Sequence, residues 1–170
     1  MKPHIFVMPA VLVLLAARAA SAQSSDPYFT DMSASYDVIY HEPGVTSHAG
    51  AHFDIASTLK RDVPFIGPVG EVGINHFPGG TTVSLLGGLR LRANVDRRIL
   101  PFAQAVLGLD HCGVCGVNDF ALQGGGGLDF RTSRNRFRIR TQIDVRHVFD
   151  QARGFTAVRA SAGIVFPLNK

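Results

Sequence analysis

Arginine and aspartate alternate with apolar residues between positions 137 and 149. Every second residue is apolar or small, beginning with Phe137, and the positions between them include Arg138 and Asp144. A period of two is the pattern of a β-strand whose two faces differ. Charged side chains on one strand face either stay in water or form ion pairs inside a closed sheet. Arginine suits the second role, because its planar fork binds a carboxylate through two hydrogen bonds.

Other segments of the chain show the same alternation, and their polar faces hold nearly balanced charges. If all of these faces point into one lumen, unpaired charges there would be costly. We therefore predict a lumen plugged by an ion-pair network, and the alternative is a solute pathway lined by arginines. The network residues are Asp37, Asp54, Glu71, Asp129, Asp144, Arg90, Arg92, Arg138, Arg140, Arg146 and Arg159.

Histidine and serine residues are the candidates for catalysis. A hydrolase would need a serine, a histidine and a carboxylate that converge at one rim. His52 and Asp54 share a strand face, but no serine falls between them on that face, and Asp144 and His147 fall on opposite faces. We therefore predict no catalytic residues and no enzyme. The residues of the enzymatic alternative are His48, His52, His76, His111 and His147, with Ser47, Ser57 or Ser84.

The two cysteines, Cys112 and Cys115, lie in the motif His-Cys-Gly-Val-Cys-Gly. An exported protein meets an oxidising compartment, so a short-loop disulfide is one interpretation and two free thiols are the other. A zinc site normally needs four ligands, and His111 is the one further candidate nearby. We predict no metal site and no other cofactor. No βαβ pattern surrounds the motif, which argues against a thioredoxin-like site.

Eight alternating segments follow one another from about residue 33. Most are about 9–13 residues long, the length that a tilted strand needs to cross a bilayer. Short links favour an up-and-down meander, and an even strand number fits an outer-membrane barrel. We predict an all-β fold, an eight-stranded antiparallel up-and-down transmembrane β-barrel. Its segments are about 33–41, 47–56, 68–77, 82–92, 100–110, 120–131, 137–149 and 155–168.

Gly124 to Gly127 lie inside the sixth segment, although glycine is locally unfavourable in a strand. Alternating large residues on both sides, such as Phe120 and Phe130, indicate that the segment stays in the sheet. Glycine then permits the tight coiling that a small barrel requires. A soluble glycine-rich loop is the alternative.

Residues 1–22 have the pattern of a cleavable signal peptide. Lys2 precedes an apolar run from Ile5 to Ala17, and Ala20-Ser-Ala22 matches a cleavage site. The run is shorter than the ~20 residues of a membrane-spanning helix. Residues 23–31 lack periodicity and are expected to form a flexible leader before a barrel domain over residues 32–170. The formal charge of +4 includes signal-peptide residues, so it does not indicate a nucleic-acid partner.

The chain from about Ser33 to Leu168 resembles the small outer-membrane β-barrel family, the OmpA/OmpX-like group of eight-stranded, porin-like proteins. The likeness rests on segments 101–109, 120–129, 142–147 and 160–166. The resemblance implies a place in the outer membrane of a Gram-negative envelope, with lipid and the barrel-assembly machinery as partners. It also implies a role in envelope structure, surface interaction or at most slow diffusion of small solutes. We expect a monomer. One departure from the family is that the chain ends Phe166-Pro-Leu-Asn-Lys170 and not on an aromatic residue.

Two alternatives to this function remain. Some small barrels of this kind are lipid-modifying enzymes. A soluble periplasmic barrel that binds a small apolar ligand, as lipocalins do, would alternate in the same way but with its apolar face inside. The polar faces here carry Gly, Ser, Asp and Arg and hardly any Lys or Glu, which are usual on solvated strand faces. This composition favours lipid outside. With a periplasmic N-terminus, the basic turns near residues 60–62, 96–98 and 134–136 would face the periplasm.

Overall fold

The computed structural model describes residues 30–41, 48–58, 65–77, 79–93, 98–132, 137–149 and 154–168. The predicted signal peptide and most of the leader lie outside the described residues. Within the described ranges, no helix is long and apolar enough to cross a membrane. The chain forms eight strands: β1 (Thr30–His41), β2 (His48–Ser57), β3 (Phe65–Phe77), β4 (Gly80–Arg92), β5 (Ile99–Cys112), β6 (Val117–Arg131), β7 (Arg138–Phe149) and β8 (Phe155–Pro167).

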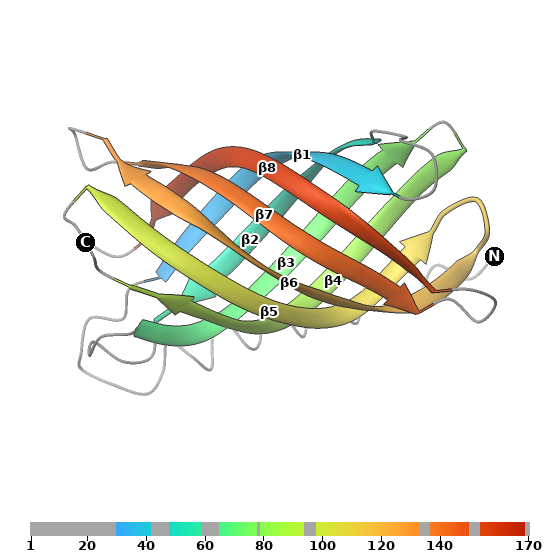
Figure 1. Cartoon of the computed structure of the whole chain (residues 1–170), viewed down its shortest axis with the longest axis horizontal. Helices are drawn as coiled ribbons and strands as arrows, with labels where there is room; N and C mark the ends of the chain where they lie inside the picture. The colour runs from blue at the N-terminus through green and yellow to red at the C-terminus, as the bar shows by residue number, and fades with distance from the viewer. Residues whose placement is uncertain are drawn as a thin grey trace.

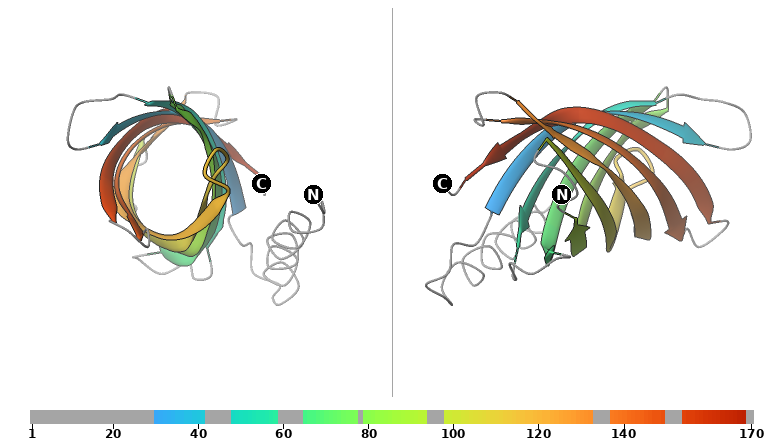
Figure 2. Two further views of the ribbon diagram at one scale, coloured as in Figure 1. Left: turned by 90° about the vertical axis from the view of Figure 1, so that its right-hand side faces the viewer. Right: turned by 60° about the vertical axis from the view of Figure 1, so that its left-hand side comes forward.

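The strands form one closed barrel (Figure 1). Each strand pairs antiparallel with the next in the sequence, and β1 pairs with β8, so that the order around the ring is β1 to β8. Tyr36 lies opposite Ala51 on β2 and opposite Ala162 on β8. Seen along its axis, the barrel is a continuous ring (Figure 2). The predicted eight-stranded up-and-down barrel is confirmed.

The two ends of the barrel, called lower and upper, differ in the strand ends and turns that they carry. The lower end is the one where β1 begins and β8 ends, on the left in Figure 1. The upper end carries the hairpin between β5 and β6, whose turn spans residues 113–116. Gly116 closes this turn with a φ of 67°, a conformation that glycine adopts without strain. Three strands begin three residues earlier than predicted: β1 at Thr30, β3 at Phe65 and β6 at Val117. Asp31, predicted as the last residue of the leader, is part of β1 and of the barrel.

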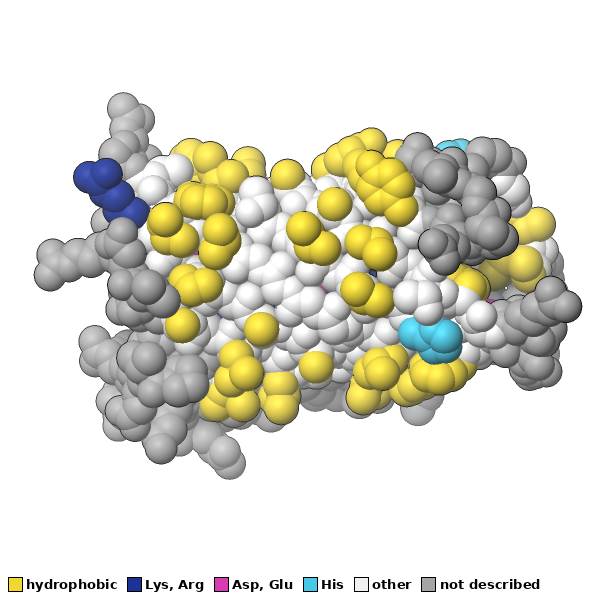
Figure 3. Space-filling view, viewed as in Figure 1, with side chains coloured by type: hydrophobic (Ala, Val, Ile, Leu, Met, Phe, Trp, Pro, Cys, Tyr) yellow, Lys and Arg dark blue, Asp and Glu magenta, His cyan; other side chains and the backbone are white. Residues whose placement is uncertain are grey.

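Apolar side chains cover the outside of the wall. Tyr36, Leu107 and Ile143 are 59%, 53% and 62% exposed, although they lie in the middle of their strands. Figure 3 shows hydrophobic side chains along the whole visible wall. A prominent arginine side chain, in dark blue, lies at the lower end of the barrel, on the left in this view. The interior is instead lined mainly by buried polar and charged residues. This distribution is the one predicted for a barrel with lipid outside, and the opposite of a lipocalin-like barrel.

The glycine run lies within β6, as predicted. A Cβ added to Gly127 would overlap the carbonyl oxygen of Thr141 and approach the Phe102 ring to 2.9 Å. A Cβ on Gly125 would overlap Asp144, whereas a Cβ on Gly124 would meet nothing within 4 Å. The inward-facing glycines therefore let β6 approach β7 closely, and the outward-facing Gly124 is not required for that approach.

Candidate functional site

The lumen contains all eleven residues of the predicted ion-pair network. Each of them is at most 6% exposed. All lie at alternate positions of their strands, so the pleat directs their side chains inward. Their contacts divide them into two groups, one toward each end of the barrel.

The lower cluster consists of Asp31, Asp54, Asp129, Arg90, Arg92, Arg138 and Arg140. Arg140 is at its centre: Nε and Nη2 donate to the two oxygens of Asp129 at 2.7 and 3.0 Å, and Nη1 donates to Asp54 at 2.9 Å. Arg90 Nη1 donates to the other oxygen of Asp54, also at 2.9 Å. Arg92 and Arg138 bind Asp31 at 2.8 and 2.9 Å. These contacts link five strands across the lumen.

An aromatic ring lies inside the lower cluster. The guanidinium carbon of Arg90 is 4.9 Å from the centroid of the Phe102 ring, and that of Arg140 is 4.6 Å away. Phe102 is 6% exposed. Cation–π attraction is strongest when both groups are desolvated, at about 2 kcal/mol or more. The ring therefore stabilises two cations that would otherwise repel one another.

The upper cluster consists of Glu71, Asp37, Asp110, Asp144, Arg146, Arg159 and His52. Arg159 Nη1 and Nη2 donate to the two oxygens of Glu71 at 2.6 and 3.0 Å, and Nη2 also donates to Asp144 at 2.7 Å. Arg146 donates to Asp110 at 3.1 Å and to Glu71 at 3.4 Å. The clusters therefore differ in charge: the lower has four arginines and three carboxylates, and the upper has two arginines, four carboxylates and one histidine.

A buried histidine connects the two clusters. His52 Nδ1 lies 2.7 Å from Asp37 Oδ1, and His52 Nε2 lies 3.9 Å from Asp54 Oδ2. His52, Asp37 and Asp54 are all at most 2% exposed. The pair of His52 and Asp37 resembles two members of a catalytic triad. It is closed to any substrate, however, since its side chains have no exposed surface.

Several network residues are absent from the sequence-based set. Asp31 could have been found, because it continues the alternation of Ser33 and Ser35 toward the N-terminus. Asp110 also belongs to the network, because it accepts a hydrogen bond from Arg146 at 3.1 Å. Gln123 accepts a hydrogen bond from Arg146 at 2.8 Å. Amide residues carry no charge signal in a sequence, so their part in an ion-pair network is visible only in three dimensions.

His76 and His147 face outward at the upper end and pair with residues of the next strand across their hairpins. The Nδ1 atoms of His76 and His147 lie 3.1 and 2.8 Å from the hydroxyl groups of Thr81 and Thr156. Ser57 Oγ lies 2.9 Å from Thr30 Oγ1, and Ser84 is buried. Ser47 and the side chain of His48 lie outside what the structure describes. Among the described residues, no hydrogen bond joins a serine to a histidine.

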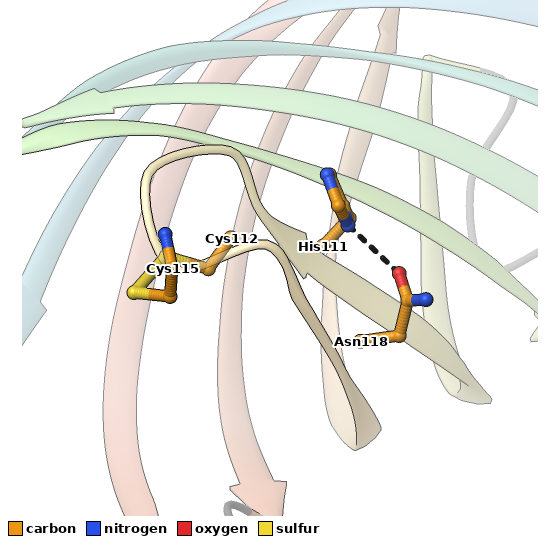
Figure 4. The surroundings of a disulfide bond; sticks show 4 residues. All are labelled: His111, Cys112, Cys115 and Asn118. Atoms are coloured by element: carbon orange, nitrogen blue, oxygen red, sulfur yellow. Dashed lines mark hydrogen bonds between the residues drawn. A yellow bond between two sulfur atoms is a disulfide. The ribbon is translucent and has the colours of Figure 1, made fainter. Parts of the chain in front are cut away.

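Cys112 and Cys115 form a disulfide at the tip of the β5–β6 hairpin (Figure 4). His111 Nδ1 lies 2.8 Å from Asn118 Oδ1 on the opposite side of the same hairpin. Within the described ranges, no group of three or more His, Cys, Asp or Glu residues is arranged to hold a metal ion. The disulfide joins the two ends of a tight turn, and His111 contacts Asn118 on the neighbouring strand.

Comparisons with known proteins agree on the fold. No protein-family model matches the chain, and no curated protein matches its sequence. Among solved structures, Neisserial surface protein A aligns with a TM-score of 0.63 at 9% identity, covering 85% of this chain and 99% of that one. The N-terminal β-barrel domain of Pseudomonas aeruginosa OprF aligns at 0.52 and 14%, covering 80% and 97%. The fold is that of the small eight-stranded outer-membrane β-barrels.

One further neighbour is described as the outer membrane enzyme PagL. It aligns with a TM-score of 0.55 at 14% identity, covering 80% of this chain and 99% of that one. The same barrel fold is therefore shared by at least one enzyme. The decision between an enzyme and a non-enzymatic barrel must come from the side chains of this chain and not from its fold.

Proposed function

We propose that this protein is a monomeric, non-enzymatic outer-membrane β-barrel with a plugged lumen. Its role is to support the envelope and to present its upper end at the cell surface. One observation carries the proposal: apolar side chains cover the wall, while arginines and carboxylates fill the interior. In water, this arrangement would expose a belt of Leu, Ile and Phe and bury many charges, which is unfavourable on both counts. In a bilayer, the belt contacts hydrocarbon.

A plugged lumen follows from how completely the interior is filled. Eight strands enclose a space that side chains can just fill. Arg140 and Arg159 are at most 1% exposed and extend across the lumen to carboxylates on other strands. Phe102 lies between two guanidinium groups in the lower half. An ion crossing the barrel would need to displace these contacts, so we expect conduction to be negligible.

The non-enzymatic part of the proposal is supported by the histidines. The buried pair of His52 and Asp37 has no access to substrate, and the outward-facing His76 and His147 contact threonines rather than carboxylates. A triad needs a carboxylate to orient the histidine and stabilise its charged form. The enzymatic alternative predicts release of fatty acid when the folded protein meets outer-membrane lipids. Mass spectrometry of those lipids after incubation is expected to show no change.

Membrane insertion is tested by folding the chain without its first 22 residues. We expect a folded, heat-modifiable band on a cold gel in detergent or vesicles, and aggregation in plain buffer. A monomer that folds in buffer without detergent would contradict the proposal. Planar-bilayer recordings test the plug separately: we expect no conductance above that of protein-free bilayers. A stable open state would contradict the plug while leaving the membrane location intact.

A further inference from the structure

A cavity of about 310 Å³ lies at the upper mouth of the lumen, above the upper cluster. Its residues come from seven of the eight strands, and most of its wall is apolar. Ile39, Phe77, Val148 and Phe155 contribute to that wall, together with the disulfide of the β5–β6 hairpin. A cavity of this size and character, with a few polar groups, is typical of sites for small ligands. Phe77 lies on the same face of β3 as Asn75, which also lines the cavity.

The polar groups of the cavity include an unbalanced pair of carboxylates. Asp110 on β5 and Asp119 on β6 are direct cross-strand partners, and both line the cavity. Like charges at such positions destabilise a sheet, because their Cβ atoms are only about 5 Å apart. Arg146 lies at the floor and donates to Asp110 at 3.1 Å. Its other nitrogens donate to Gln123 and Glu71, so its charge is shared with a third carboxylate.

Two buried acceptor atoms at the cavity have no hydrogen-bond partner among the described residues. They are Oδ1 of Asp110 and Oδ1 of Asn75. Asp110 is 8% exposed and Asn75 is 4% exposed, and both line the cavity. Buried polar atoms without partners are costly and rare in native proteins. The site therefore has more acceptors and more negative charge than Arg146 satisfies, and a ligand that supplied donors and a positive charge would complete it.

We propose that this mouth cavity binds a small organic ammonium ion with an apolar body. The ammonium group would lie between Asp110 and Asp119, with Asn75 as a further acceptor, and the apolar body would contact Phe77, Phe155 and the disulfide. An ammonium group carries three donors and one charge, which is what the two carboxylates and the amide oxygen require. The mostly apolar wall favours an organic cation with an apolar body over a bare metal ion such as calcium, which prefers a full shell of oxygen ligands.

The test uses the full barrel in lipid nanodiscs and 2-phenylethylammonium chloride as the probe. Titration is followed by the backbone amide NMR signals. We expect saturable shifts at positions 75, 110 and 119 and none at the lower cluster. The neutral alcohol of the same shape, 2-phenylethanol, is expected to bind at least tenfold more weakly. Equal binding of the alcohol, or no saturable shift, would overturn the proposal.

Variants locate the site. Asp119→Asn keeps the shape of the side chain and removes its charge, so affinity for the ammonium probe is expected to fall at least fivefold. Asn118→Ala changes the neighbouring residue, whose side chain contacts His111, and is expected to leave affinity unchanged. If Asp119→Asn keeps full affinity, the ammonium site is wrong. If calcium chloride shifts the same amides and displaces the probe, the site binds a metal ion and the proposal fails. None of these outcomes bears on membrane insertion or on conductance.

Discussion

Substitution of Arg159 by Met is expected to destabilise the barrel more than the same substitution at an exposed arginine of the rim. Arg159 is 1% exposed and donates to both oxygens of Glu71 and to Asp144. Its removal leaves two buried carboxylates without their main cation, which costs about 3–5 kcal/mol in buried pairs. Arg146 remains 3.4 Å from Glu71 and offsets part of this loss. We therefore expect the lower part of that range, about 3 kcal/mol.

The assay is equilibrium unfolding in urea with the barrel in lipid vesicles, followed by far-ultraviolet circular dichroism. With a slope of about 1–3 kcal/mol per molar urea, the loss lowers the midpoint by about 1–3 M. Met nearly keeps the length and apolar stem of Arg, so the change is mainly one of charge and hydrogen bonding. Arg131→Met is the matched control: Arg131 is exposed at the lower end, and its change is expected to stay within about 0.5 kcal/mol.

A double-mutant cycle decides whether the loss comes from the ion pair. Arg159→Met and Glu71→Gln are measured singly and together, and the double variant is expected to lose about 1–3 kcal/mol less than the sum of the single variants. A loss below about 1 kcal/mol for Arg159→Met, with no coupling to Glu71, would refute the reasoning. The lumen would then be hydrated enough to screen its charges, and the network would not hold the barrel together.

Three further predictions use the same unfolding assay. Gly127→Ala is expected to lower the free energy of unfolding by about 1–3 kcal/mol, because its Cβ would overlap the β7 backbone. Gly124→Ala should change it little, because a Cβ there meets open space, and equal effects of the two variants would argue against close packing at Gly127. Ile143→Arg, in the middle of the outer belt, should lower the free energy of unfolding by about 2–4 kcal/mol, and Phe137→Arg at the lower rim by about 0–1 kcal/mol. Equal losses for the two variants would argue against contact of the belt with lipid. Phe102→Ala should cost about 3–5 kcal/mol, and a loss under 1 would contradict its place between two arginines.

The alternation of residue types was enough to predict the barrel and which residues face its lumen. A strand has a strict period of two, so Arg140 and Ile139 must face opposite sides once the segment is a strand. Residue type then decided which side meets lipid. Phe77 shows that residue type alone is an incomplete guide: its ring is apolar, but it falls on the same face as Asn75 and lines the mouth cavity. Position in the pleat, and not residue type, determined its direction.

The partners within the lumen could not be predicted in the same way. Arg140 and Asp54 are 86 residues apart and lie on strands that are not neighbours in the barrel. Their contact depends on the stagger between successive strands, which the alternation does not encode. The mouth cavity was missed for a related reason. Asp110 and Asp119 face each other only because the β5–β6 turn sets their register, and a register shifted by one residue would separate them.

The long sequence separation of these contacts has a consequence for how the barrel is made. Arg138 reaches Asp31 from 107 residues away, and Arg159 reaches Glu71 from 88. A hairpin, or a sheet whose first and last strands have not yet met, brings neither contact into place. Incomplete sheets therefore carry a surplus of solvated charge that opposes their entry into hydrocarbon. Pairing of β1 with β8 closes the barrel and brings many of these charged residues to their partners in one step. Sheets in which β1 and β8 are still unpaired are therefore not expected to accumulate.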